Sequence, residues 1–305
     1  MFDELTDCML CPRECHADRV NGKPGYCKSD DGSNIGSVCI HMGEEPVICG
    51  EKGICNVFFT HCNLQCIYCQ NFQISCNSIN MVGTGLQFSD AMDKIIKILD
   101  KGINLLGFVS PSHCIPQIKY IIEKLRNTGR NPVIVYNSNA YDKVDTLKNI
   151  EEYVDVYLPD FKYSDKQLAK ELSDVPDYPE KAIAAIKEMV RQKGTSIRLN
   201  EHKQVESGVI IRHLVLPGYV DNSVNALKIL SEEISPLLHI SLMSQYFPTP
   251  NVKNNLNLGR KLNPDEYQMV VEALDLYGFH RGWIQDMESS EHYKPDFDNE
   301  HPFNE

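Results

Sequence analysis

Cysteine is almost absent from the body of this chain of 305 residues. Eleven of its twelve cysteines lie between Cys8 and Cys76, and only Cys114 lies beyond them. A disulfide scaffold usually spreads its bridges through a small secreted fold, so this distribution argues against one. We expect no secretory leader, because Met1 is followed by an acidic stretch rather than by basic residues and an apolar run. We therefore expect a cytoplasmic protein, in which cysteines more often bind metals or react than form disulfides.

Long apolar runs and positive charge are also scarce. No stretch approaches the roughly 18 apolar residues of a membrane-spanning helix. Acidic residues outnumber basic ones by 42 to 30, which gives a formal net charge of -12. Such a chain is poorly suited to coat nucleic acid or an anionic membrane, so we expect neither as a partner. Hydrophobic residues make up 42% of the sequence, which is enough for a buried core.

Three segments of the chain differ in composition. Residues 1–52 are rich in Cys, Gly, Asp and His and lack sustained periodicity, so we expect a metal or the rest of the chain to order them. Residues 53–285 alternate strand patterns with helix patterns. Residues 286–305 form an acidic tail with His and Pro, which we expect to be loosely ordered.

The middle segment predicts six strands, most of them followed by a helix. The predicted strands are 56–60, 103–109, 133–136, 154–158, 208–216 and 239–243, and the predicted helices are 89–101, 116–126, 179–192, 223–233 and 264–277. Such alternation indicates an α/β fold with a parallel sheet and right-handed crossovers. A barrel or partial barrel of six βα units fits, with its active residues at the carboxyl ends of the strands. An open doubly wound sheet is the alternative, but the Gly-rich phosphate turn typical of its first strand is absent.

The strongest motif directly follows the first predicted strand. Cys62, Cys66 and Cys69 are spaced by three and two residues, so their thiolates can converge on one iron–sulfur cluster. A cubane cluster has four irons, so three cysteines leave one iron for a substrate-like ligand, which suits chemistry better than electron storage. The alternative is a zinc site completed by His61 or a distant cysteine. Zinc sites usually pair two short knuckles, which a lone triplet with an aromatic residue before its last cysteine does not match.

This triplet, with Tyr68 before its third cysteine, is the signature of the radical S-adenosylmethionine superfamily. The chain resembles the branch that is similar to pyruvate formate-lyase activating enzyme, and in particular a paralogue group of that enzyme. Further segments that carry the resemblance are 11–15, 43–46, 109–113 and 212–218, and together they cover about residues 8–290. The resemblance implies a partial (β/α)6 TIM-like barrel with a cysteine-rich amino-terminal extension.

The resemblance also implies cofactors and the residues that bind them. Cys62, Cys66 and Cys69 would hold a [4Fe-4S] cluster, and S-adenosylmethionine would bind beside it. For S-adenosylmethionine, the resemblance implies Tyr68 beside the adenine, Asp160 for the ribose or a bound cation, and Lys162 for the carboxylate. It also implies Ser110 and His113, which stand where the family usually has a Gly-Gly-Glu segment. Asn137 and Ser138 complete the implied set.

These polar residues also make sense without the resemblance, because each group follows a predicted strand, where a barrel concentrates its chemistry. The ordinary interpretation stays open, since 137–139 is also common turn sequence and Asp160 with Lys162 can be a surface pair. Gln245 and Tyr246 follow the sixth strand and are expected to face the pocket. His213, inside strand 208–216, is either a hydrogen-bonded core residue or a functional one.

Cys8, Cys11, Cys15 and Cys27 form a second candidate metal site. Four cysteines within 20 residues of a core-poor segment point to a metal as the organiser, either zinc or a second iron–sulfur cluster. Buried free thiols are the alternative. His16, Cys39, Cys49 and Cys55 are alternative ligands in this region, and nothing in the sequence assigns a role to Cys76.

The resemblance therefore predicts a radical S-adenosylmethionine oxidoreductase. Such an enzyme cleaves S-adenosylmethionine reductively to a 5′-deoxyadenosyl radical, which abstracts hydrogen from a protein or peptide, for example the glycine backbone of a glycyl radical enzyme. A small-molecule substrate is equally open, because known activators carry their extra cysteines after the triplet and this chain carries them before it. A flavodoxin or ferredoxin-type electron donor is implied. The non-enzyme alternative is a metal-stapled electron-transfer or scaffold protein, which predicts four cysteine ligands per cluster and no polar groups in the pocket.

Overall fold

The computed structural model describes residues 2–78, 85–291, 294–299 and 301–303. Its strands form one curved sheet in the order β1-β2-β3-β4-β5-β7-β8-β9, and β6 pairs with β7. The strands are β1 (Ile35–His41), β2 (Ile54–Phe59), β3 (Leu105–Val109), β4 (Val133–Ser138), β5 (Val156–Pro159), β6 (Arg198–Leu199), β7 (Val205–Leu214), β8 (His239–Met243) and β9 (Gly282–Ile284). Neighbours from β2 to β9 along this path are parallel, whereas β1 and β6 pair antiparallel.

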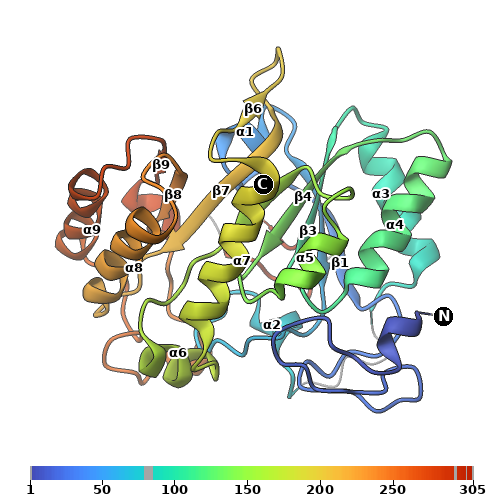
Figure 1. Cartoon of the computed structure of the whole chain (residues 1–305), viewed down its shortest axis with the longest axis horizontal. Helices are drawn as coiled ribbons and strands as arrows, with labels where there is room; N and C mark the ends of the chain where they lie inside the picture. Colours follow the sequence, from blue (N-terminus) through green and yellow to red (C-terminus); the bar gives the residue numbers. More distant parts are fainter. Residues whose placement is uncertain (1, 79–84, 292–293, 300, 304–305) are drawn as a thin grey trace.

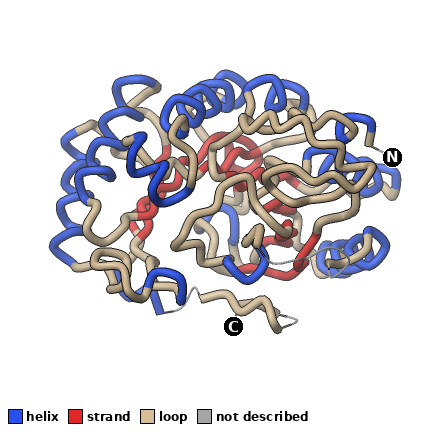
Figure 2. Tube along the Cα trace, turned by 90° about the horizontal axis from the view of Figure 1, so that it is seen from below, coloured by secondary structure: helices blue, strands red, loops and turns tan. Residues whose placement is uncertain are grey.

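Helices cover the outer side of the sheet, as Figures 1 and 2 show. Those described are α1 (Pro46–Cys49), α2 (Phe72–Ser75), α3 (Phe88–Leu99), α4 (Ile115–Asn127), α5 (Val144–Asn149), α6 (Lys166–Ser173), α7 (Tyr178–Lys193), α8 (Val220–Glu233) and α9 (Pro264–Leu276). Asn263 caps α9 in a capping box with Glu266. None of the described helices combines the length and the apolar character that crossing a bilayer would require.

The predicted partial barrel is confirmed. The six predicted strands are β2, β3, β4, β5, β7 and β8, with ends that differ by up to three residues, and the five predicted helices are α3, α4, α7, α8 and α9. Among the described strands, β9 does not pair with β1, so the sheet curves without closing. Figure 2 looks onto the end where the loops gather, and the strands trace an arc there with the helices outside it.

The inner face of the sheet changes from apolar to polar along the strands. At the amino ends, buried residues from five strands pack with Ile48 of α1 and form a separate core: Ile54, Leu105, Val135, Val156, Leu158, Val205 and Ile210. Side chains on one face of a strand recur every second residue. Two residues beyond members of this core the same face therefore presents Asn56, Asn137, Asp160 and Arg212. These four polar residues lie toward the carboxyl ends of the strands, above the apolar core, and we call them the polar floor.

Gly107 shows how tightly this floor is built. A Cβ at this position would lie 2.1 Å from Oδ1 of Asn56 on the neighbouring strand β2. Only glycine leaves room for that amide, which donates a hydrogen bond of 3.0 Å to Oε1 of Glu44. Glu44 belongs to the amino-terminal segment, so this segment is anchored directly on the barrel.

The two outer segments take part in the fold more than their composition indicated. Residues 1–52 supply β1, whose register with β2 runs from Ile35 opposite Phe59 to His41 opposite Ile54. In the tail, the rings of Phe297 and Phe303 pack on Phe58 of β2, with centroids 5.2 and 5.6 Å away. The prediction of a loosely ordered tail is therefore wrong for these described residues.

Candidate active site

A cavity of about 440 Å³ lies at the carboxyl ends of the parallel strands. The predicted site residues that line it are Cys62, Cys66, Tyr68, Cys69, Ser110, Asn137, Ser138, Asp160 and Lys162. They come from the last residues of β4 and from the loops after β2, β3 and β5, which are far apart in the sequence and adjacent in the sheet. The parallel sheet therefore brings the thiols and the polar groups to one place.

The three cysteines lie on the loop that leaves β2. His61, with φ at 62°, adopts the left-handed conformation and turns the chain out of the strand. Burial raises the pKa of Cys62 to about 12 and that of Cys69 to about 11. As free thiols these groups are neutral at pH 7, so binding a metal centre must release protons.

Each of the three sulfurs has a hydrogen-bonding neighbour. The contacts are from the Leu64 N–H at 3.4 Å and Asn139 Nδ2 at 3.5 Å to Cys62 Sγ, from Ser173 Oγ at 2.9 Å to Cys66 Sγ, and between Ser75 Oγ and Cys69 Sγ at 3.1 Å. Hydrogen bonds to the sulfurs are one of the means by which proteins set the reduction potential of an iron–sulfur cluster. Ser173 in turn hydrogen-bonds the hydroxyl of Tyr163, and this hydroxyl lies 2.8 Å from that of Tyr68. A chain of hydrogen bonds therefore runs from Cys66 to Tyr68.

The donor set fits an iron–sulfur cluster better than a zinc ion. Zinc holds its thiolates at about 2.3 Å in a tight tetrahedron, whereas a four-iron cluster spreads them over separate irons. His61, the alternative zinc ligand, is not among the residues that line the cavity.

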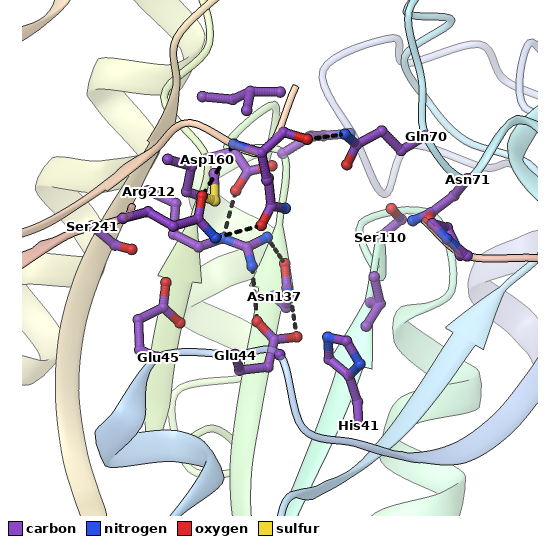
Figure 3. Close-up of a pocket in the computed structure, with 18 of the residues that line it drawn as sticks. His41, Glu44, Glu45, Gln70, Asn71, Ser110, Asn137, Asp160, Arg212 and Ser241 are labelled. Carbon is purple, nitrogen blue, oxygen red and sulfur yellow. Dashed lines mark hydrogen bonds and ion pairs between the residues drawn. The ribbon is translucent and has the colours of Figure 1, made fainter. Parts of the chain in front are cut away.

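The polar floor of the cavity is a chain of alternating charges centred on Arg212 (Figure 3). Its Nε donates to Asp160 at 2.7 Å, Nη1 to Glu44 at 2.9 Å and Nη2 to Asn137 at 2.7 Å. Lys162 Nζ donates to the other oxygen of Asp160 at 2.7 Å. Burial alone would raise the pKa of Asp160, but Arg212 and Lys162 together lower it. Two cations and two carboxylates therefore balance each other inside the cavity.

Glu45 stands outside this balance. It lines the cavity, is 6% exposed, and its Oε2 has no hydrogen-bond partner. Burial raises the pKa of its carboxyl, which favours the protonated form. In Figure 3 it lies beside Glu44 and below Ser241. The cavity thus holds one carboxyl group with an oxygen left for a ligand.

Sequence reasoning missed Glu44, Glu45 and Arg212. The segments that contain them, 43–46 and 212–218, were noted only because they carry the family resemblance. A signal was present, since Arg212 is a charged residue inside an apolar strand, and such a residue needs a buried partner. Its acidic partner Glu44 lies 168 positions away, which no local pattern reveals.

Two predicted residues lie outside the cavity. His113 is buried, with Nε2 2.9 Å from the Thr60 carbonyl, and its Nδ1 has no partner. It lines a second void, among the amino-terminal cysteines, rather than the active-site cavity. Tyr246 is buried and its hydroxyl donates to the Leu258 carbonyl, whereas Gln245 does line the cavity.

His213 is a core residue. It is fully buried, and Nδ1 lies 2.6 Å from the Phe161 carbonyl while Nε2 lies 2.8 Å from Ser223 Oγ. Both ring nitrogens are therefore used in joining β7 to its neighbours, and His213 does not line the cavity.

The amino-terminal cysteines are brought together as well. Cys8, Cys11, Cys15 and Cys27 line the second void, which measures about 10 Å³. The other candidate cysteines, Cys39, Cys49, Cys55 and Cys76, line neither cavity. His16 pairs with Asp7 at 2.8 Å on the surface.

Comparison with known proteins agrees with this site. Residues 48–175, which include the cysteine triplet, match the family model of a 4Fe-4S single cluster domain. The uncharacterized protein MJ0674 of Methanocaldococcus jannaschii is 27% identical over 286 residues, 89% of this chain and 75% of that protein.

Two solved structures have a similar fold. HydG, a maturase of the [FeFe]-hydrogenase, superposes with a TM-score of 0.53 at 13% identity, and SuiB of Streptococcus suis bound to S-adenosylmethionine with 0.51 at 12%. Each match covers 78% of this chain and 53% of the other, so the chain spans about half the length of these proteins. These comparisons therefore agree with a partial α/β barrel fold and with a 4Fe-4S cluster domain around the cysteine triplet.

Proposed function

We propose that the protein cleaves S-adenosylmethionine reductively in this cavity and passes the radical to a bound substrate. The observation that carries the proposal is the set of cavity-lining residues. Cys62, Cys66 and Cys69 are the cysteines among the described residues that line the cavity, and they share it with polar groups from the ends of β3, β4 and β5. These three cysteines would hold the cluster, which would supply the one electron needed to cleave the sulfonium carbon–sulfur bond of S-adenosylmethionine.

The residues around the triplet have distinct tasks in this proposal. Lys162 has two N–H groups beyond the one on Asp160, and they can bind the methionine carboxylate. Asp160 keeps lone pairs for a ribose hydroxyl. Tyr68, fixed by its hydrogen bond to Tyr163, can pack on the adenine. That SuiB was solved with S-adenosylmethionine supports a ligand of this kind in the same fold.

In this proposal the substrate is either a peptide, of which a single residue enters the cavity, or a small molecule. S-adenosylmethionine would share the cavity with the substrate, so only the reacting group of the substrate needs to enter it. SuiB, which was also solved with its precursor peptide SuiA, supports a peptide substrate. Activation of a glycyl radical enzyme would be one case, and a small molecule is the alternative. Glu45, with its free oxygen, is the group most available to orient such a substrate.

The electron would come from a flavodoxin or ferredoxin-type donor. The test therefore replaces this donor with a chemical reductant under anaerobic conditions. After iron and sulfide have been added to the purified protein, chromatography should detect 5′-deoxyadenosine and methionine in equal amounts once S-adenosylmethionine is supplied.

Cys66→Ala should abolish this reaction, because two thiolates do not hold an open-iron cubane. Cys76→Ala is the matched control, since this cysteine lies on the same stretch of chain but lines neither cavity, and it should keep both iron and product. Product formation that survives replacement of all three triplet cysteines would rule the proposal out.

A further inference from the structure

Four thiols of the amino-terminal segment surround a void that is separate from the candidate active site. Cys8, Cys11 and Cys27 are buried and Cys15 is exposed. Backbone hydrogen bonds shape the loops that carry them. One example is the 2.9 Å bond from the Cys8 N–H to the Ala17 carbonyl. The cysteines are thus gathered by the fold and not merely close in sequence.

Gly25 shows that the two halves of this group pack directly on each other. A Cβ at Gly25 would lie 2.3 Å from Sγ of Cys15. The glycine therefore lets the turn that carries Cys27 approach the turn that carries Cys15. Any larger residue would push the two thiols apart.

Arg19 is a second, independent observation that points to an anion at this group. Its side chain is 1% exposed, and the guanidinium is always protonated. It donates to the carbonyls of Asp30 and His113 and lies 3.8 Å from Sγ of Cys8. It forms no ion pair with a carboxylate in the described parts of the chain, and an unpaired buried charge is costly. Thiolates are the anions that can balance it, and thiolates in such a buried place require a metal.

We propose that Cys8, Cys11, Cys15 and Cys27 bind a single thiophilic divalent ion, zinc in the first place, at a site distinct from the iron–sulfur cluster. Four thiolates on a divalent ion carry a net charge of about -2, which Arg19 offsets in part. The void of about 10 Å³ has room for one ion, since a water-sized sphere needs about as much. Because no described group already has single-ion geometry, binding must draw the thiols inward.

The position of the site connects it to the catalytic cysteines. Arg13, between Cys11 and Cys15, donates from Nε to the carbonyl of Asn63, the residue after Cys62, at 3.1 Å. Asn63 also lines the second void and bonds the carbonyl of Tyr141 at 2.8 Å. The ion would therefore fix the turn that braces one side of the triplet loop.

The test is metal analysis of the full-length protein, purified without oxygen and supplied with both iron and zinc. The parent should carry about one zinc per chain in addition to its iron. Cys11→Ala and Cys27→Ala should each lose the zinc and keep the iron, whereas the triplet variant Cys66→Ala should do the reverse. Cys39→Ala is the matched control, a buried cysteine outside the void, and should keep both metals.

X-ray absorption at the zinc edge of the parent protein keeps the test decisive if a variant does not fold. Four sulfur neighbours at about 2.3 Å are expected. Removal of zinc by a chelator should also accelerate amide hydrogen exchange in the peptide that contains Asn63. Zinc that stays with the Cys11 and Cys27 variants, nitrogen or oxygen ligands in place of sulfur, or a loss of several irons on changing Cys11 would each overturn the single-ion site.

Discussion

At the scale of single residues, the cavity is organised by one guanidinium. Arg212 bonds Glu44, Asn137 and Asp160, which come from the amino-terminal segment, β4 and the end of β5. Arginine suits this role because its planar group donates in several directions at once. Lys162 ends the chain of charges and has two N–H groups left for a ligand beyond the one on Asp160.

Lys162→Ala should weaken the binding of S-adenosylmethionine. In the proposed function Lys162 binds the methionine carboxylate, so the variant removes that cation and leaves Asp160 one partner short. We expect a loss of about 1.5–3 kcal/mol, the range for a charged hydrogen bond, or roughly tenfold to a hundredfold in affinity. Calorimetric titration of the ligand into anaerobic, iron-loaded protein measures it.

The control for this variant is Lys166→Ala, which removes an exposed lysine of α6 that pairs with Glu180 of α7. Its affinity should equal that of the parent, and both variants should keep their iron because lysine is not a cluster ligand. If Lys162→Ala binds S-adenosylmethionine as tightly as Lys166→Ala does, the carboxylate does not lie at Lys162.

At the scale of elements, sequence periodicity predicts the strands and helices of the barrel, which alternate along the chain. It predicts a strand at 239–243, and β8 has these bounds in the structure. The missed elements, β1 and α6 among them, are fixed by other means. β1 forms by pairing with β2, and α6 begins at Asp165, whose side chain accepts the Leu168 N–H. Long-range pairing and single caps leave little periodic signal.

The ends of three successive strands share a feature that periodicity does not reveal. His61, Ser110 and Ala140, which follow β2, β3 and β4, all adopt positive φ angles of 55–62°. Residues other than glycine seldom adopt this conformation, and it often occurs at functional sites. Sequence located the polar residues after these strands, but the turns that aim Ser110 into the cavity and His61 away from it depend on the folded loops.

His213 should make the stability of the β7 region depend on pH. Burial lowers its pKa from the ordinary 6.5 to about 4. The unfolded chain then binds a proton at a pH where the folded chain does not, so stability is lost as pH falls from 6.5 to about 4. A shift of this size corresponds to about 3 kcal/mol. Denaturant unfolding at a series of pH values should show the decline.

His213→Asn is the variant that isolates this effect. It can keep a donor toward the Phe161 carbonyl but cannot take up a proton. Its unfolding free energy should be lower at pH 7 and should fall less steeply between pH 6.5 and 4. A slope that matches the parent would assign the pH dependence to other groups.

At the scale of the whole molecule, the cavity is assembled from segments that the sequence analysis kept apart. The barrel supplies the cysteine loop and the polar floor, while the amino-terminal segment supplies His41, Glu44 and Glu45. The tail adds Phe303, whose ring centroid lies 4.0 Å from that of His41. These contributions could not be predicted from composition, because contacts between distant segments decide where each one packs.

The tail is also tied to the region behind the triplet. Asp296 and the Phe297 N–H bond the side chain of Gln73 on α2, each at 2.9 Å. Phe58 then receives the rings of Phe297 and Phe303. The described part of the tail therefore covers one side of the cavity and limits the access of water to it, which the proposed radical chemistry would require.

Phe303→Ala should open this side of the cavity. Its ring is only partly buried, so we expect a stability loss of about 1–2 kcal/mol, below the roughly 3–5 kcal/mol of a core phenylalanine. The larger effect should be on the cluster, because solvent exposure governs its chemistry. In air, the visible absorbance of the iron-loaded variant should decay several-fold faster than that of the parent. Phe2→Ala, which removes a ring packed on Phe88 and Tyr120 away from the cavity, should decay like the parent. Equal decay in all three proteins would mean that the tail does not shield the cluster.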